Sequence, residues 1–232
     1  MIVRYEGVII DKADSGVGED GKGHGILVSK DGDCLAVKNC IIDLGNEDPA
    51  KVDEVLSVTR GASAQIDYTT ISGGAKLVLL GCGDKEWELL EKDKYVIFYR
   101  CILQNGCRRF PEVQSGMICV MYNCTIRNWG LKSFWDTRAF GAWAHHGGVI
   151  MMHNCHFEQG SFWQTGFLNF FKDLANHIGQ AINDRGLFGL RLKDFIPGVC
   201  RGAIATDGGR VMLNNCTANK WWIYLENNTV KR

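Results

Sequence analysis

The residues of this chain that could do chemistry by their type are first of all its cysteines, and their spacing limits what they could do. The sequence has 10 cysteines, but no two of them form the C-x-x-C pair that zinc sites and redox motifs use. Most lie inside runs of alternating apolar residues. We therefore expect buried free thiols that act as small apolar fillers, and not a metal or redox centre.

Four histidines are the next candidates, because imidazole nitrogens commonly bind metals. His145 and His146 are followed by His153 and His156. Successive side chains of a strand point to opposite faces, so this spacing divides the four imidazoles between faces. We expect surface or core histidines here, with a metal site as the alternative.

One dipeptide, Asn-Cys, recurs along the chain within the same apolar frame. The positions five and three before the cysteine are apolar in each copy. The preceding residue is Asn in four copies and Arg100 in the fifth, and Asn suits a tight turn because it tolerates left-handed backbone angles. The copies lie at residues 32–45, 94–106, 116–130, 148–160 and 209–220, and residues 64–74 fit the frame with Thr70 in place of the cysteine.

The spacing of these copies predicts the fold. With Thr70 included, successive steps are 30, 31, 23, 31 and 61 residues, which is typical of a β-solenoid. We predict an all-β, single-stranded right-handed parallel β-helix that forms one domain over residues 1–232. Its coils would stack about 4.8 Å apart, so the cysteines would form a column. A disulfide would distort the strand register, so we expect thiols there. A β-sandwich is the alternative fold.

One stretch departs from the strand pattern. It predicts an amphipathic helix near residues 165–184, within an insertion at 161–200, because six apolar residues recur at helical spacing. We expect this helix to pack on the side or end of the solenoid, with a subunit interface as the alternative. No cap precedes the first coil, so we also expect a partner to cover that end. The six residues are Phe167, Phe170, Phe171, Leu174, Ile178 and Ile182.

Composition narrows the classes of partner. Lys+Arg and Asp+Glu both total 26, so no electrostatic argument favours nucleic acid or an acidic membrane. No apolar run is long enough to span a bilayer, and the start MIVRYEGVIIDKADSG does not read as a signal peptide. We expect either cytoplasmic synthesis, with incorporation into an assembly such as a virion, or a mature secreted chain.

Three stretches resemble the pectate lyase family of right-handed parallel β-helices, over roughly residues 20 to 160. The most specific is the second, in which Arg109-Phe110-Pro111 stands at the expected distance before Tyr122-Asn123. The stretches are DEVLSVTRGASAQIDYTTISGGAKLVLLG (53–81), YVIFYRCILQNGCRRFPEVQSGMICVMYNCTIRNWG (95–130) and GAWAHHGGVIMMHNCHFEQG (141–160).

The resemblance implies β-elimination on a polyuronate, an acidic polysaccharide. In that reaction a base removes the proton next to a carboxylate, and a cation such as calcium stabilises the charge that develops. By position, Arg109 would be the proton-abstracting residue and Lys76 its electrostatic partner. Arginine normally stays protonated, so it would need neighbouring cations and desolvation to act as a base.

The resemblance also implies residues that hold the substrate and the metal. Glu54 and Asp53 would be calcium ligands, although Val58 stands where the family has a further acidic ligand. Calcium prefers six to eight oxygen ligands, so a reduced set would bind it weakly. The substrate contacts would be Arg60, Arg108 and Gln114, the last in place of a family arginine.

Two functions remain open at this point. The first is a calcium-assisted lyase, which the retained Lys76 and Arg109 favour. The second is a catalytically degenerate β-helix that serves as a carbohydrate-binding or assembly protein, for example a homo-oligomeric virion spike or decoration component. The incomplete calcium set and the uncapped first coil favour this second function. Under either, tryptophans could stack on sugars; the candidates are Trp129, Trp135, Trp143 and Trp163.

Overall fold

The structure is a computed structural model of the whole chain. It describes residues 2–11, 16–17, 23–44, 54–59, 61–74, 76–81, 94–106, 109–130, 139–159 and 201–227. The helix expected near 165–184 and its insertion at 161–200 lie outside these ranges. Within the described ranges, no helical segment has the length and apolarity that a membrane crossing requires.

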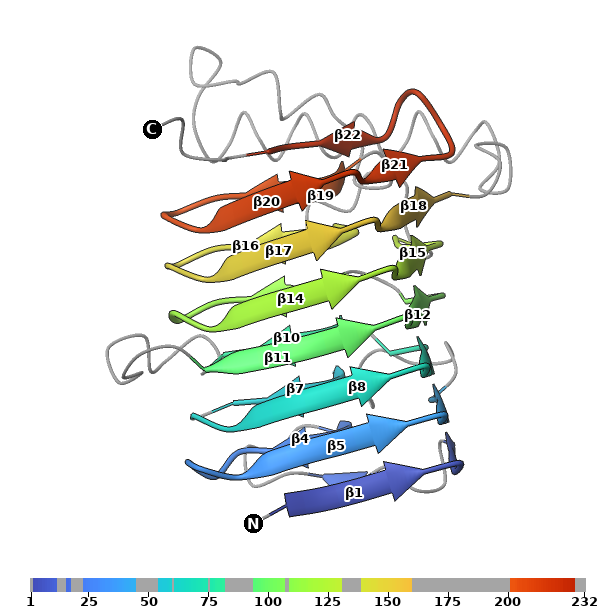
Figure 1. Cartoon of the computed structure of the whole chain (residues 1–232), viewed down its shortest axis with the longest axis vertical. Coiled ribbons are helices and arrows are strands. Elements are labelled where there is room, and N and C mark those ends of the chain that lie inside the picture. Colours follow the sequence, from blue (N-terminus) through green and yellow to red (C-terminus); the bar gives the residue numbers. More distant parts are fainter. Residues whose placement is uncertain are drawn as a thin grey trace.

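The described chain winds through three long sheets, and each coil adds one short strand to each sheet (Figure 1). We name them sheets A, B and C. Sheet A contains β1 (Ile2–Glu6), β5 (Cys34–Lys38), β8 (Ser63–Asp67), β11 (Tyr95–Tyr99), β14 (Ile118–Tyr122), β17 (Val149–His153) and β20 (Arg210–Asn214). Sheet B contains β2 (Ile9–Asp11), β6 (Ile41–Asp43), β9 (Thr70–Ser72), β12 (Ile102–Gln104), β15 (Thr125–Arg127), β18 (His156–Glu158) and β21 (Thr217–Ala218).

Sheet C completes each coil and is the sheet on which the predicted site residues Glu54 and Lys76 lie. In spatial order it contains β22 (Tyr224–Leu225), β19 (Arg201–Ala205), β16 (Ala142–Ala144), β13 (Glu112–Val113), β10 (Lys76–Leu80), β7 (Glu54–Val58), β4 (Gly23–Val28) and β3 (Gly16–Val17). Neighbouring strands are parallel except β3 and β4. The predicted parallel β-helix is therefore confirmed; its right-handed winding stays a prediction, because strand pairing does not fix it.

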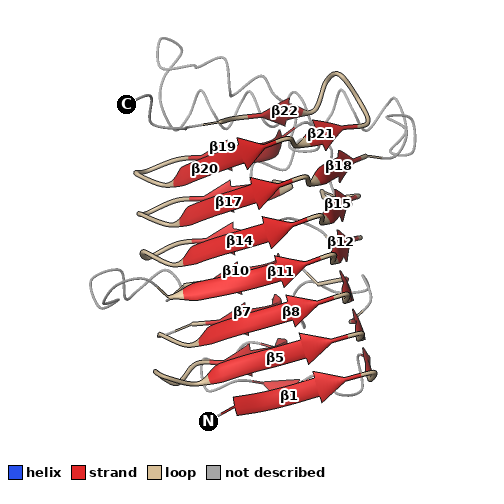
Figure 2. Ribbon diagram, in the orientation of Figure 1, coloured by secondary structure: helices blue, strands red, loops and turns tan. Residues whose placement is uncertain are grey.

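The core is built from side chains that stack in register through the coils. Along each strand of sheet A, alternate residues point inward because side chains of a strand alternate between faces. One inward column is at most 4% exposed along its length, and it supplies a continuous apolar interior that no single coil could make. Its members are Leu35, Ala64, Val96, Cys119, Ile150 and Val211. The strands themselves form the stack in Figure 2.

The Asn-Cys dipeptide marks the turn between sheets A and B. The residue before the cysteine, or before Val8 and Thr69 in the coils that lack it, has a φ angle between 50° and 67°, in the left-handed region that Asn and Gly adopt most readily. This explains why the strand pattern stops there and resumes in a new direction. The turn residues are Gly7, Asn39, Tyr68, Arg100, Asn123, Asn154 and Asn215.

The predicted position of one coil was wrong by one residue. Thr69, and not Thr70, lies level with the cysteines, because Ile102 pairs with Thr70 and Cys101 therefore faces Thr69. The Thr69 hydroxyl accepts a hydrogen bond from the Cys40 amide at 3.3 Å. The physical reason is that Tyr68 takes the left-handed turn position in this coil, which its residue type does not reveal.

The cysteines that follow the turn form the predicted column, and the cysteines of the described ranges are free thiols. Four of the thiols in this column donate to a carbonyl of the preceding coil, as Cys101 Sγ does to Ile66 O at 3.2 Å and Cys124 Sγ to Phe98 O at 3.5 Å. Hydrogen bonds with Cys101 and Cys155, together with burial, raise the pKa of the Cys124 thiol. These cysteines therefore fill space and satisfy backbone carbonyls.

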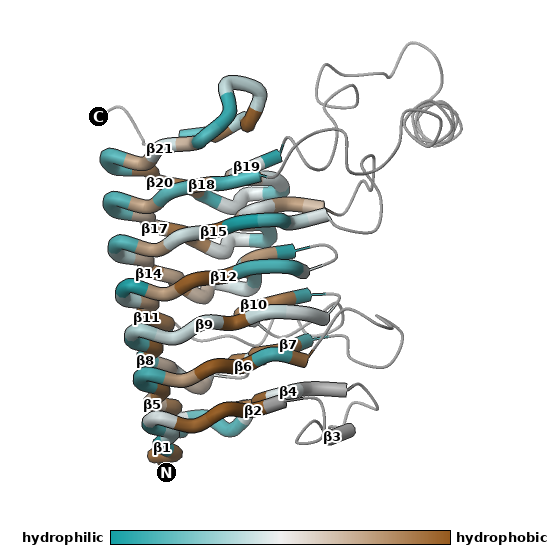
Figure 3. Tube along the Cα trace, turned by 90° about the vertical axis from the view of Figure 1, so that its right-hand side faces the viewer, coloured by the Kyte–Doolittle hydropathy of each residue, from teal (hydrophilic) through white to brown (hydrophobic). Residues whose placement is uncertain are grey.

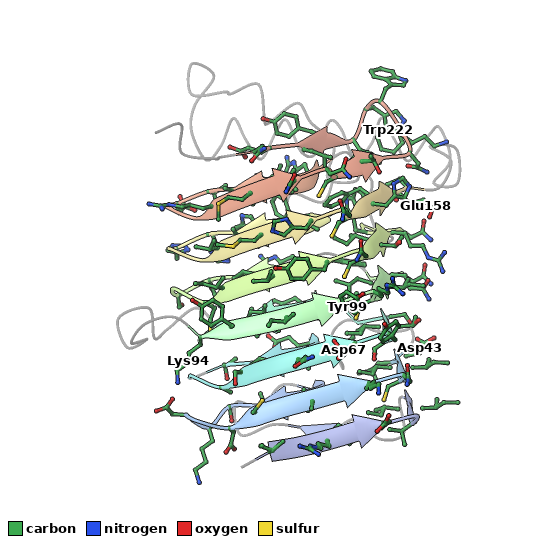
Figure 4. The ribbon with its side chains drawn as sticks, in the orientation of Figure 1. Asp43, Asp67, Lys94, Tyr99, Glu158 and Trp222 are labelled. Atoms are coloured by element: carbon green, nitrogen blue, oxygen red, sulfur yellow. The ribbon has the colours of Figure 1, made fainter. Side chains whose placement is uncertain are left out.

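Outside the core, side chains on the outer faces vary from coil to coil. Tyr99 and Asp67, which Figure 4 labels, occupy paired positions on adjacent strands of sheet A. Tyr99 also packs edge-on against Tyr68, with ring centroids 5.5 Å apart. The inner columns are apolar in every coil, whereas the residue types on the outer faces differ between coils.

The inner columns predict that alanine substitutions of two neighbouring residues will differ sharply in their effect on stability. Leu103 is fully buried and Ile102, next to it, is half-buried on the outer face of sheet B. We expect Leu103→Ala to lower the free energy of unfolding by about 2–5 kcal/mol because it leaves a cavity. Ile102→Ala should cost no more than about 1 kcal/mol. Urea unfolding followed by circular dichroism measures both; equal losses would contradict the inward assignment.

Candidate functional site

Three residues that lie far apart in the sequence become neighbours where the sheet C segments of three successive coils begin. Lys76 pairs with Glu54 of the coil before it and forms a bridge with Arg109 of the coil after it. Arg109 in turn forms a bridge with Phe140. Because coils stack about 4.8 Å apart, these residues form one row. The structure thus brings together the predicted catalytic pair and the predicted calcium ligand Glu54.

Lys76 and Glu54 form a shielded ion pair. The distance from Lys76 Nζ to Glu54 Oε1 is 3.3 Å, and the side chains are 13% and 1% exposed. A carboxylate so buried requires a compensating charge, and the lysine of the next coil supplies it.

Arg109 is held by a second buried carboxylate, that of Glu112. Arg109 Nη1 donates to Glu112 Oε1 at 2.6 Å, and these side chains are 14% and 1% exposed. His145 Nε2 lies 3.0 Å from the same oxygen, and its Nδ1 lies 2.6 Å from Nδ1 of the exposed His146. Arg109, Glu112 and His145 therefore form one network across two coils.

The charge state of Glu112 follows from these contacts. Burial alone would raise the pKa of its carboxyl, but the hydrogen bond from His145 and the charge of Arg109 outweigh burial and lower the pKa to about 2. The carboxylate is therefore ionised at neutral pH, and it stabilises the protonated guanidinium of Arg109.

Aromatic rings stack beside this network. Trp143 stacks on His145 with centroids 3.9 Å apart and on Phe140 with centroids 4.8 Å apart. Arg109 Cζ lies 4.6 Å from the centre of the Trp143 ring, a cation–π contact. The Trp143 indole also donates to Thr206 Oγ1 at 3.0 Å. Trp143 is therefore a structural part of the network, with its ring faces in contact with neighbours.

Two buried atoms of the network, Arg109 Nε and Glu112 Oε2, have no hydrogen-bond partner among the described side chains. The same holds for Oε1 of Gln114, which was predicted as a substrate contact and is 1% exposed. Its burial places the Gln114 side chain away from a ligand at the surface.

The residues do not fit a calcium ion well. Of the two predicted ligands, Asp53 lies outside the described residues and Glu54 is bound to Lys76. Val58, at the position of a further acidic ligand, is a fully buried core residue. Across the described ranges, no group of three or more His, Cys, Asp or Glu side chains could hold a metal. A second cation beside Lys76 would also be repelled.

The other predicted residues are placed as follows. Arg60 and Arg108 lie outside the described ranges, as do Trp135 and Trp163. Trp129 is 1% exposed and packs edge-on against Phe157, so it cannot stack on a sugar at the surface. The remaining histidines are separated: His153 stacks on Tyr122 of sheet A, and His156 bonds Thr217 of sheet B.

The sequence did not predict that Glu112 binds Arg109 or that His145, considered only as a metal ligand or a surface or core histidine, contacts Glu112. Glu112 follows Arg109 by three residues in the sequence. Because a carboxylate at that separation can reach a guanidinium, this spacing could have predicted the ion pair. No known protein family, curated protein or solved structure matches this chain.

The pKa of Glu112 predicts a pH-dependent contribution to stability. Its folded-state pKa of about 2 lies below the ordinary value of 4.5, so ionised Glu112 stabilises the fold above pH 4.5, and this contribution is lost as the pH falls through about 2. We expect Glu112→Gln to cost about 2–3 kcal/mol at neutral pH and progressively less in acid. Urea unfolding at a series of pH values measures this; a loss independent of pH would contradict it.

Proposed function

We propose that this protein is a catalytically degenerate, pectate lyase-like β-helix that binds an acidic polysaccharide along sheet C without cleaving it. The observation that carries the proposal is the pairing of both candidate catalytic cations with buried carboxylates. Lys76 is bound to Glu54 and Arg109 is bound to Glu112.

This pairing argues against proton abstraction by Arg109. A guanidinium must lose a proton before it can act as a base, and a nearby anion opposes that loss. Glu112 lies 2.6 Å away and stays ionised at neutral pH. Arginine would act as a base beside other cations and without a partner anion. Here it forms a salt bridge instead.

Binding along the row is supported by the order of its side chains. Arg109 Nε, Glu112 Oε2 and Gln114 Oε1 are buried, so a polymer on the outer face would contact the partly exposed side chains of Lys76 and Arg109 instead. A polymer that crosses the coils would also meet a new residue of the row about every 4.8 Å.

Charge favours an acidic polymer over a neutral one. Lys76 and Arg109 are the cations of the row, and their side chains are 13% and 14% exposed, whereas those of Glu54 and Glu112 are 1% exposed. A uronate carboxylate could approach these cations, with an affinity that decreases as salt is added.

A second candidate, β-elimination, is favoured by one observation. Glu54, Lys76 and Arg109 lie in successive coils, and these are the residues to which the resemblance assigns the chemistry. Cleavage would require a ligand to displace Glu112 from Arg109. We assign no step to calcium, because Glu54 is bound to Lys76.

Electrophoresis in gels that contain polygalacturonate tests binding. We expect the polymer to retard the protein, and Lys76→Gln to reduce the retardation several-fold because it removes one cation of the row. Lys38→Gln is the matched control: it removes an exposed lysine on sheet A, paired with Glu6. Equal retardation of both variants would contradict the proposed site.

An absorbance assay for unsaturated product tests the chemistry on the same samples. We expect no strong rise with polygalacturonate and millimolar calcium. A calcium-dependent rise that disappears in Arg109→Ala would overturn the proposal and establish the lyase.

A further inference from the structure

Two adjacent histidines connect the buried network to solvent where a sheet C strand ends. His145 is 3% exposed, whereas His146 is exposed and has a φ angle of 46°. Their Nδ1 atoms lie 2.6 Å apart, and Nε2 of His145 lies 3.0 Å from Oε1 of Glu112. Trp143, which contacts Arg109, also stacks on His145. A chain of hydrogen bonds therefore runs from the buried carboxylate through His145 to the surface at His146.

The contacts fix where the hydrogens of this pair lie. The carboxylate of Glu112 is ionised at neutral pH and can only accept, so Nε2 of His145 carries a hydrogen and donates it. A neutral His145 then has a lone pair at Nδ1, which accepts the hydrogen at Nδ1 of His146. Among the ring nitrogens of the pair, Nε2 of His146 is the one that remains to take up a proton. Proton uptake therefore occurs at the exposed residue.

In the coils before the pair, buried carboxylates balance the charges of the row. Arg109 is bound to Glu112, and Lys76 is bound to Glu54. These two ion pairs add no net charge to the row. A proton on His146, by contrast, adds one positive charge beside it, two ring contacts away from Arg109.

In the coil after the pair, Asp207 occupies the turn position that matches His146. Ala144 pairs with Ala205, so the residues two further along stand level, and both have positive φ angles, of 46° and 47°. The strands that follow these turns, β17 and β20, lie in adjacent coils (Figure 3). A carboxylate one coil away attracts an imidazolium. The turn can therefore hold the charged form of His146.

We propose that His145 and His146 form a proton-operated switch that strengthens the binding of acidic polysaccharide as the pH falls. Above neutral pH the pair is neutral, and the polymer meets only Lys76 and Arg109. In mild acid His146 becomes an imidazolium and adds a third cation for a uronate carboxylate. Histidine is the side chain whose charge ordinarily changes between about pH 5 and 8. This inference rests on the proposed function, because it describes regulation of the same site.

The hydrogen bonds of the pair hold the new charge in place. The imidazolium of His146 donates from Nδ1 to His145, and His145 donates from Nε2 to the carboxylate of Glu112. Hydrogen bonds from a charged donor are stronger than those between neutral groups. Protonation therefore strengthens the chain of contacts that orients the exposed ring, and does not break it.

Nitrogen NMR spectra of isotope-labelled imidazole rings test the switch without any polymer. At about pH 8 we expect His145 with its hydrogen on Nε2 and His146 with its hydrogen on Nδ1. Between about pH 8 and pH 5, where histidine ordinarily titrates, Nε2 of His146 should become protonated. Loss of one set of signals in His146→Gln assigns them. The opposite tautomers, or a His146 ring that stays neutral throughout, would overturn the switch.

Gels that contain polygalacturonate test the effect on binding. Carboxylates with ordinary pKa values stay ionised at both about pH 7.5 and about pH 5.5, so the charge of the polymer is constant. We expect retardation of the wild type, relative to a gel without polymer, to rise roughly two- to fivefold at the lower pH, the effect of one exposed ion pair. In His146→Gln this rise should disappear, because glutamine can donate to His145 but gains no charge.

His153→Gln is the matched control. It removes an imidazole from sheet A, where His153 stacks on Tyr122, and should keep the rise seen in the wild type. An equal rise in the two glutamine variants would overturn the switch and leave the proposed function, which Lys76→Gln tests at neutral pH, in place. Absence of retardation of the wild type at both pH values would overturn the proposed function and this inference together.

Discussion

The parallel, in-register pairing of coils is the constraint on which the rest of this molecule depends. Lys76 meets Arg109 because each begins a sheet C segment of its coil. The side-chain period of a strand is two residues, so a slip of one residue would turn each inner column outward. The burial of those columns therefore fixes the register, and the register fixes the row of charged residues.

Stacking also creates an electrostatic difficulty. Cations in successive coils stand about 4.8 Å apart and repel one another, most strongly where solvent is excluded. The row relieves this repulsion with carboxylates: Glu54 extends the row beside Lys76, and Glu112 lies beside Arg109. A carboxylate beside each cation favours the protonated form of that side chain. The arrangement therefore favours binding of a ligand over removal of a proton from it.

The sequence predicted the parts of the fold that repeat. The apolar frame around each Asn-Cys dipeptide predicted the coils, the turn and the thiol column, because these features depend on residues close together in the chain. It failed at Thr69, where Tyr68 replaces Asn at the turn. It also did not predict the contact of His145 with Glu112 of the preceding coil. That contact depends on the register across Pro111, and a short two-residue strand there gives no periodic pattern from which to predict it.

The outer row of sheet C shows how stacking sets the surroundings of the charged network. Leu27 begins a row that continues through Ser57, Leu79, Glu112 and Trp143. Ser57, Leu79 and Glu112 are at most 3% exposed, so these positions of the outer face are shielded from solvent. Glu112 therefore meets Arg109 and His145 away from water, where charges interact most strongly.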